Sequence, residues 1–183
     1  MTRSPARWLG PSLGVGLLLA MVTGVIAAPP AQPRNFVTAM SGGAEVPIRD
    51  THARGAATFQ LSPDGTEISY TLVASNIHNV FMAHIHLQNP GQQTGGIVVW
   101  LAPSTTPGVT LPLGGGRHDG LLAKGTFTAD DLVGVLDGGT LADLLDAIEA
   151  GIAYVNVHTD DGIAPANPGP GDFPGGEIRG QLP

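Results

Sequence analysis

The sequence predicts an all-β domain, an antiparallel eight-stranded β-sandwich or Greek-key barrel with one or two short helices inserted before the last two strands. Three observations predict it. Apolar and polar residues alternate in short runs, Gly and Pro turn signals separate these runs, and helical spacing occurs only late in the chain. Because eight strands in one small open sheet would leave exposed edges, we expect two packed sheets or a closed barrel.

The first 28 residues differ from the rest of the chain. Arg3 and Arg7 precede an apolar stretch that ends in small residues, the order typical of a secretory signal peptide. The alternative is an uncleaved N-terminal anchor, since about 20 apolar residues span a bilayer. We therefore expect a secreted or periplasmic protein that has no membrane contact unless this segment stays uncleaved. Residues 29–35 read as a Pro-rich spacer, and residues 36–183 as the β domain.

Charge and cysteine usage exclude several classes of protein. The net charge is −7, and without residues 1–28 it becomes −9, because that segment holds two Arg and no acidic residue. A nucleic-acid partner is therefore not expected. The absence of cysteine excludes disulfides, thiolate metal sites and a cysteine nucleophile. No nucleophile elbow, zinc-protease motif or phosphate-binding loop occurs, so an enzymatic activity would have to depend on a bound metal.

Alternation predicts eight strands in chain order. A turn signal at residues 63–65 joins the second and third runs into a hairpin. A long polar connection is expected over residues 102–120, and a loop of sixteen residues over 160–175. The eight runs are residues 35–40, 55–62, 67–75, 80–88, 97–102, 121–128, 152–159 and 176–182.

Helical spacing appears only between the sixth and seventh runs. Thr128 is a candidate N-cap followed by acidic residues. Thr140 and Asp143 have the spacing of a capping box, apolar residues then recur on one face, and Gly151 can end the helix. We expect the stronger helix over residues 141–150.

Strand geometry decides which histidine side chains can meet. Residues two apart on a strand point to the same face, so Ile85 faces the core while His84 and His86 face the other way. In the run 152–159 the same counting places His158 on the non-core face. His-x-His on a strand can offer two imidazole nitrogens to one ion. A third histidine from a neighbouring strand completes a set suited to Cu or Zn.

We therefore predict a Cu or Zn site formed by His84, His86 and His158, with the long loops near these strands covering it. Additional ligands are expected from His118, Asp119 and Asp160. The alternative is that the histidines are ordinary polar residues on a solvent-facing strand face. The site has no predicted catalytic residue of its own.

Charged residues of the closing run have a structural interpretation. Glu177 and Arg179 share one strand face, and we expect a partly buried ion pair there, with Glu45 as a third member, that fixes the last strand. The alternative is a pair that faces a ligand.

Several segments, in this order, resemble the CHRD domain, a module named for its repeats in chordin and common in exported bacterial proteins. They are SGGAEVP (41–47), AHIH (83–86), GTFTADDL (125–132), AYVNVHT (153–159) and GEIRGQL (176–182). The resemblance covers residues 35–183, and the last two segments are its most specific part. It implies an exported β-sandwich module. In chordin the module belongs to a protein that binds secreted growth factors.

A weaker resemblance is to Cu/Zn superoxide dismutase. That family holds copper on the outer face of an eight-stranded barrel, and His84, His86 and His158 match its strand ligands in order. The chain departs from the family because it lacks a counterpart of the bridging histidine, the zinc-loop His/Asp cluster and the disulfide cysteines. These departures put dismutase activity in doubt.

Three functional hypotheses follow. The leading one is an exported metal-binding module that uses Cu or Zn. The competing one is an extracellular module that binds a protein or a polysaccharide through the loops at residues 102–120 and 160–174. The third is a copper-dependent redox enzyme of the dismutase type.

Overall fold

The computed structural model describes residues 35–103, 115–166 and 168–183. The predicted signal peptide, nearly all of the Pro-rich spacer and most of the predicted 102–120 connection lie outside these residues. None of the described helices has the length and apolarity that a membrane span requires.

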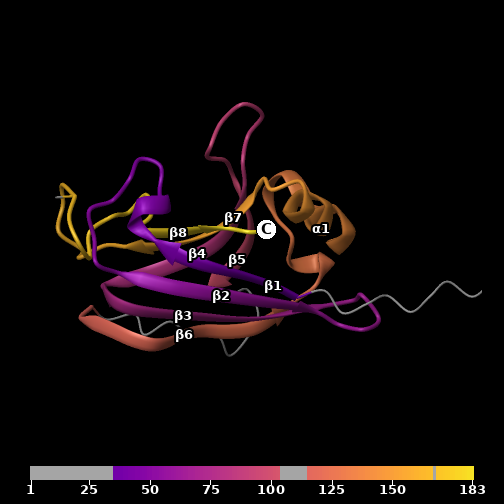
Figure 1. The fold of residues 1–183 in the computed structure, drawn as a ribbon, viewed down its shortest axis with the longest axis horizontal. Helices are drawn as coiled ribbons and strands as arrows, with labels where there is room; N and C mark the ends of the chain where they lie inside the picture. Colours follow the sequence, from indigo (N-terminus) through magenta and orange to yellow (C-terminus); the bar gives the residue numbers. More distant parts are fainter. Residues whose placement is uncertain (1–34, 104–114, 167) are drawn as a thin grey trace, which may run out of the picture.

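Eight antiparallel strands form one sheet that curls into a nearly closed barrel (Figure 1). Their order across the sheet is β5-β4-β7-β8-β1-β2-β3-β6. This confirms the predicted fold class and, of its two forms, favours the barrel. The strands are β1 (Asn35–Ser41), β2 (Arg54–Leu61), β3 (Ile68–His78), β4 (Val80–Leu87), β5 (Ile97–Ala102), β6 (Arg117–Phe127), β7 (Ala153–Thr159) and β8 (Ile178–Gln181).

The seam between the edge strands β5 and β6 is covered in two ways. The Tyr70 hydroxyl on β3 donates to the Leu101 carbonyl on β5 at 2.7 Å. The segment after β6 also pairs with β5, where the Val133 amide donates to the Val98 carbonyl at 2.9 Å. These bonds satisfy backbone groups that an open edge would expose.

The pairing of β3 with β6 is longer than alternation predicts. β6 begins at Arg117 rather than near residue 121, and β3 continues to His78. The two strands change register between Ala74 and Ile77, and Asn76 there has a φ of 54°. Such a bulge interrupts the period-2 pattern, so the sequence shows a loop where the strands still pair.

The connection from β6 to β7 holds the helices. It contains η2 (Ala129–Asp131), η3 (Gly134–Leu136) and α1 (Leu141–Glu149), while η1 (Gly42–Ala44) follows β1. The capping box of Thr140 and Asp143 is confirmed. Leu144 and Ile148 of α1 are buried in the hydrophobic core at one end of the barrel (Figure 1).

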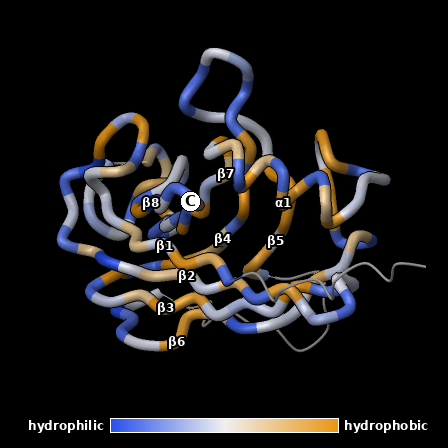
Figure 2. Tube along the Cα trace, turned by 45° about the vertical axis from the view of Figure 1, so that its right-hand side comes forward, coloured by the Kyte–Doolittle hydropathy of each residue, from blue (hydrophilic) through white to orange (hydrophobic). Residues whose placement is uncertain are grey.

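The interior of the barrel is apolar. Residues such as Leu72, Ile85, Val155 and Ile178 are completely buried in one hydrophobic cluster. Hydrophobic residues are concentrated along β4 and β5 and around α1, while the loops beyond the barrel ends are mostly hydrophilic (Figure 2). Because the core faces of β4 and β7 point inward, their alternate residues lie on the outer face of the barrel.

Candidate metal centre

The three predicted histidines come together on neighbouring strands. β4 and β7 pair antiparallel, with His84 opposite Asn156 and Met82 opposite His158. The ring centroids of His84 lie 5.4 Å from those of His86 and 5.0 Å from those of His158. One potential ligand atom from each of the three rings lies within 4.8 Å of the other two.

These histidines lie outside the hydrophobic core, yet they are not solvent-facing. The exposed fractions of His84, His86 and His158 are 0%, 8% and 6%. Loop backbone covers them, through the carbonyls of Gly95 in the β4–β5 loop and Pro174 in the β7–β8 loop. The expectation of a solvent-facing strand face is therefore wrong.

Backbone carbonyls fix the tautomers of two rings. Nδ1 of His86 donates to the Gly95 carbonyl at 3.0 Å, and Nδ1 of His158 donates to the Pro174 carbonyl at 2.8 Å. A carbonyl only accepts, so each of these Nδ1 atoms carries the proton and each Nε2 keeps its lone pair. Nε2 of His86 is buried without a hydrogen-bond partner among the described residues, and so is Nε2 of His84.

All three imidazoles are held neutral. Burial, followed by the positive charges that His158 and His86 would carry, lowers the pKa of His84 to about 3. Burial lowers the pKa of His158 to about 4, and it also lowers the pKa of His86. Neutral imidazoles are the form that binds metal, so the rings need lose no proton to bind an ion at neutral pH.

The spacing of the donor atoms suits a metal ion. Nδ1 of His84 lies 3.2 Å from Nε2 of His158, and Oδ1 of Asn156 lies 2.9 Å from the same Nε2. Two nitrogens bound at about 2.0–2.1 Å to a tetrahedral ion are about 3.3 Å apart. As oriented, the amide oxygen faces the lone pair of Nε2, a repulsive pairing that a cation between them would relieve.

Aromatic side chains enclose the rings. Trp100 lies edge-to-face against His84, with centroids 4.2 Å apart, and Tyr154 stacks on His86 at 4.9 Å. The Arg179 guanidinium carbon lies 3.5 Å from the centre of the Tyr154 ring. Because β7 lies between β4 and β8 in the sheet, His86 and Arg179 approach this ring from opposite sides. We did not predict Asn156 or Tyr154 as part of the site, although alternation along β7 places both on the face of His158.

The predicted ion pair takes another form. Glu177 accepts hydrogen bonds from the Thr51 and Thr159 hydroxyls at 2.6 and 2.7 Å. Glu45 and Arg179 are both buried, and Oε1 of Glu45 and Nη1 of Arg179 have no hydrogen-bond partner in the described parts of the chain. Burial raises the pKa of Glu45, whereas the Val46 amide and the charges of Arg179 and Arg49 act in the opposite direction. Glu45 and Arg179 thus attract each other without a direct bond.

The predicted additional ligands lie elsewhere. His118 and Asp119 are on β6, where His118 donates to the Leu121 carbonyl and Asp119 pairs with Arg117 at 2.7 Å. Asp160 groups with two other aspartates of the β7–β8 loop. None of the three predicted residues joins the histidine group within the described ranges.

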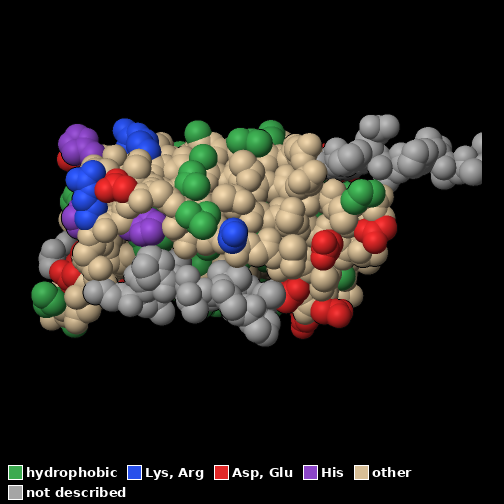
Figure 3. Space-filling model, turned by 90° about the horizontal axis from the view of Figure 1, so that it is seen from below, with side chains coloured by type: hydrophobic (Ala, Val, Ile, Leu, Met, Phe, Trp, Pro, Cys, Tyr) green, Lys and Arg blue, Asp and Glu red, His purple; other side chains and the backbone are tan. Residues whose placement is uncertain are grey.

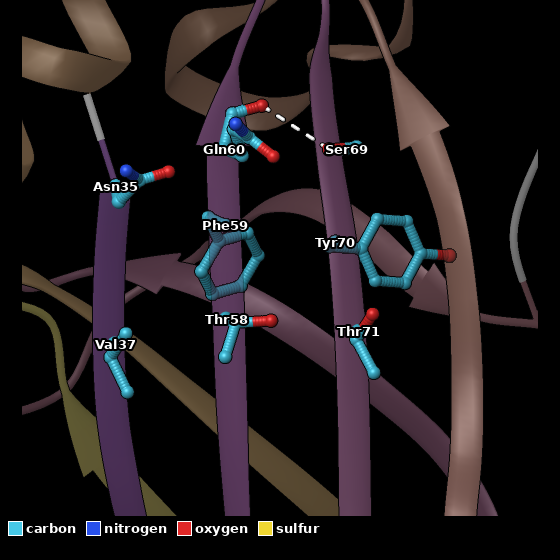
Figure 4. A pocket seen from close by; sticks show the side chains of 8 residues that line it. All are labelled: Asn35, Val37, Thr58, Phe59, Gln60, Ser69, Tyr70 and Thr71. Atoms are coloured by element: carbon cyan, nitrogen blue, oxygen red, sulfur yellow. Dashed lines mark hydrogen bonds between the residues drawn. The ribbon is translucent and has the colours of Figure 1, made fainter. Parts of the chain in front are cut away.

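Two surface hollows differ in their chemistry. One, of about 270 Å³, lies over β1, β2 and β3 and is lined by Thr, Asn, Gln, Ser, Val, Phe and Tyr (Figure 4). It contains no Asp, Glu, His, Lys or Arg, so acid–base chemistry has no support there. The other, of about 430 Å³, is lined by residues 43–48 and Gln93 and therefore reaches Glu45, beside the candidate centre.

The family model of the CHRD domain matches residues 36–182. No curated protein and no solved structure is significantly similar to the chain.

Proposed function

Because this chain belongs to the CHRD domain family, we propose that it is an exported binding domain that holds one Cu or Zn ion through His84, His86 and His158. One observation carries the proposal. Three buried, neutral imidazoles converge, and two of them donate Nδ1–H to backbone carbonyls, which leaves each Nε2 unprotonated. Nε2 of His86 has no partner among the described residues, and Nε2 of His158 lies 3.2 Å from Nδ1 of His84. Metal-binding histidines characteristically make such a bond with the nitrogen that does not bind the metal.

Each residue of the cluster would have its own role in holding the ion. Nε2 of His86 and Nε2 of His158 are the donors that the tautomers leave available, and His84 adds a third nitrogen from the same strand as His86. The Asn156 amide oxygen is placed to contribute next to His158. The Gly95 and Pro174 carbonyls fix two ring orientations, so the loops pre-organise the set.

The test uses the mature chain, residues 32–183, whose only tryptophan is Trp100. Trp100 contacts His84, so Cu(II) bound at the site should quench its fluorescence, with an end point at one ion per chain. Elemental mass spectrometry of Cu- and Zn-loaded protein gives the stoichiometry independently. We expect His84→Ala and His158→Ala to lose the ion, while His52→Ala, which removes an exposed imidazole, keeps it.

Two results would refute the proposal. One is metal below one ion per chain in the wild type. The other is equal metal in the wild type and both site variants. Circular dichroism in chelator checks that the variants fold, and His86→Gln provides a further variant of smaller volume change.

A second candidate function is protein or polysaccharide binding outside the cell. The observation that favours it is apolar exposure on the outer face of β1, β3 and β6, where Val37 is 60% exposed and Leu121, paired with Val73, is 50% exposed. On the face seen from below, scattered apolar side chains lie between an end where Lys or Arg, His and acidic side chains are mixed and an acidic end near α1 (Figure 3). If this surface binds a secreted partner, Leu121→Asp should lose a partner that His84→Ala retains, as measured by cross-linking in the extracellular fraction.

A further inference from the structure

We propose that the histidine centre selects the monovalent ion Cu(I) over divalent Zn(II) and Cu(II). The inference rests on the proposed metal site and adds the charge of its ion. It follows from three features of the surroundings: the charge of the donor set, a buried cation behind His86, and the enclosure of the rings.

The donor set carries no negative charge. The three imidazoles are neutral, and the adjacent amide of Asn156 is neutral as well. No carboxylate belongs to the histidine group in the described part of the chain. The free energy of moving an ion out of water grows with the square of its charge, so a buried divalent ion needs anionic ligands far more than a monovalent ion does.

A buried cation, Arg179, lies near one of the three ligands, His86. Arg179 is 3% exposed, and its guanidinium lies on the face of Tyr154 opposite the one that stacks on His86. The two stacking distances place the guanidinium carbon within about 9 Å of the His86 ring. A positive charge at His86 is therefore repelled, and the repulsion on a divalent ion is twice that on a monovalent ion.

Glu45 does not supply the missing negative charge. Its carboxyl lies on the far side of Asn156 from His158 and is not part of the ligand group. Burial raises the pKa of its carboxyl, whereas the positive charges of Arg179 and Arg49 lower this pKa and offset the negative charge of the ionised form. Glu45 and Arg179 together thus bring no net negative charge to the ion.

The enclosure of the rings disfavours extra ligands. Trp100 and Tyr154 pack against His84 and His86, and His84 is completely buried. A divalent ion bound by three histidines usually recruits a water or an anion as its fourth ligand. Imidazole is a copper ligand, and three neutral imidazoles can hold Cu(I), a closed-shell monovalent ion, without a water or an anion as a fourth ligand.

The experiment measures the affinities of the mature chain for the bare ions. Cu(I) is titrated anaerobically in ascorbate against bathocuproine disulfonate, and Zn(II) and Cu(II) are titrated against chromophoric chelators at the same pH. We expect one Cu(I) per chain, bound at least about a hundredfold more tightly than Zn(II). Tighter or equal binding of Zn(II) or Cu(II) would overturn the selectivity but leave the metal site standing. Failure of all three ions to bind would overturn the site itself.

A charge variant tests the reason for the selectivity. Arg179→Gln removes the buried cation, and Arg179→Lys, the matched control, keeps it. Because the repulsion scales with ion charge, the glutamine variant should gain about tenfold in Cu(I) affinity and about a hundredfold in Zn(II) affinity. The lysine variant should keep the wild-type ratio. Equal gains for both ions in the glutamine variant, or no gain, would refute the charge argument.

Discussion

Acidification should destabilise the metal-free protein steeply between about pH 7 and about pH 5. The folded state holds His84 and His158 neutral, with pKa values of about 3 and about 4. In the unfolded chain both rings have the ordinary histidine pKa of about 6.5. Over this interval the unfolded chain binds protons that the folded chain does not bind. The stability contributed by the neutral rings is therefore complete above the unfolded pKa and is lost as the pH falls below it.

The size of the effect follows from the two pKa values. From about pH 7 to about pH 5, a histidine that titrates only in the unfolded state lowers the free energy of unfolding by about 2 kcal/mol. His84 and His158 together therefore cost about 4 kcal/mol, and His86, whose pKa is also lowered, adds to this loss. A domain of this size has a total stability of about 5–15 kcal/mol, so the loss is a large fraction of it.

Urea unfolding in chelator at several pH values measures this loss. His158→Gln should reduce the pH-dependent loss by about 2 kcal/mol, because one of the two strongly shifted rings is gone. His52→Gln, which removes an exposed imidazole, is the matched control. A free energy of unfolding that stays constant from about pH 7 to about pH 5 would refute the reasoning, since it would mean that the rings titrate alike in both states.

Two further substitutions test the β7–β8 loop that covers the site. Gly176 has a φ of 113°, and a Cβ there would collide with Glu45 Oε1 and Asn156 Nδ2. Gly176→Ala should therefore lower the free energy of unfolding in urea by about 3 kcal/mol and weaken metal binding. Gly162→Ala is the control, because Gly162 also has a positive φ but a Cβ there would meet no other atom. Equal losses of stability in the two variants would contradict the argument that a Cβ at Gly176 collides with its neighbours. Glu177→Gln replaces a carboxylate that accepts three hydrogen bonds, and should cost about 2 kcal/mol and speed amide exchange at Gly171. Unchanged exchange at Gly171 would show that the carboxylate does not hold the loop.

The fold was predictable because its strands alternate in the ordinary way. The hairpin of β2 and β3 and the capping box of α1 were predicted within a few residues of their observed bounds. The extension of β3 and β6 was not predictable, because a bulge near Asn76 breaks the alternation that reveals a strand. Residues 117–120 consequently read as loop.

The histidine cluster was only partly predictable. Alternation placed His84, His86 and His158 on non-core faces, and the pairing of β4 with β7 brings these faces together. Cover by the long loops was predicted, but the nearly complete burial of the three rings was not, since Gly- and Pro-rich loops look solvated in the sequence. The bonds that orient the rings come from the backbone carbonyls of Gly95 and Pro174, and any residue type supplies a carbonyl.

Because the cluster lies on the outside of the barrel, mutations that affect folding and mutations that affect the histidine site fall in different parts of the chain. Substitutions in the apolar interior act on folding, whereas changes in the β4–β5 and β7–β8 loops act on the geometry of the imidazoles. Because the loops hold His86 and His158 through main-chain oxygens, most loop side chains can diverge without loss of those bonds. Gly95 and Gly176 are exceptions, since a Cβ at either position would collide with neighbouring atoms. An evolving lineage, or a protein engineer grafting loops, could therefore change what reaches the centre while inheriting the same three ligands and the same barrel.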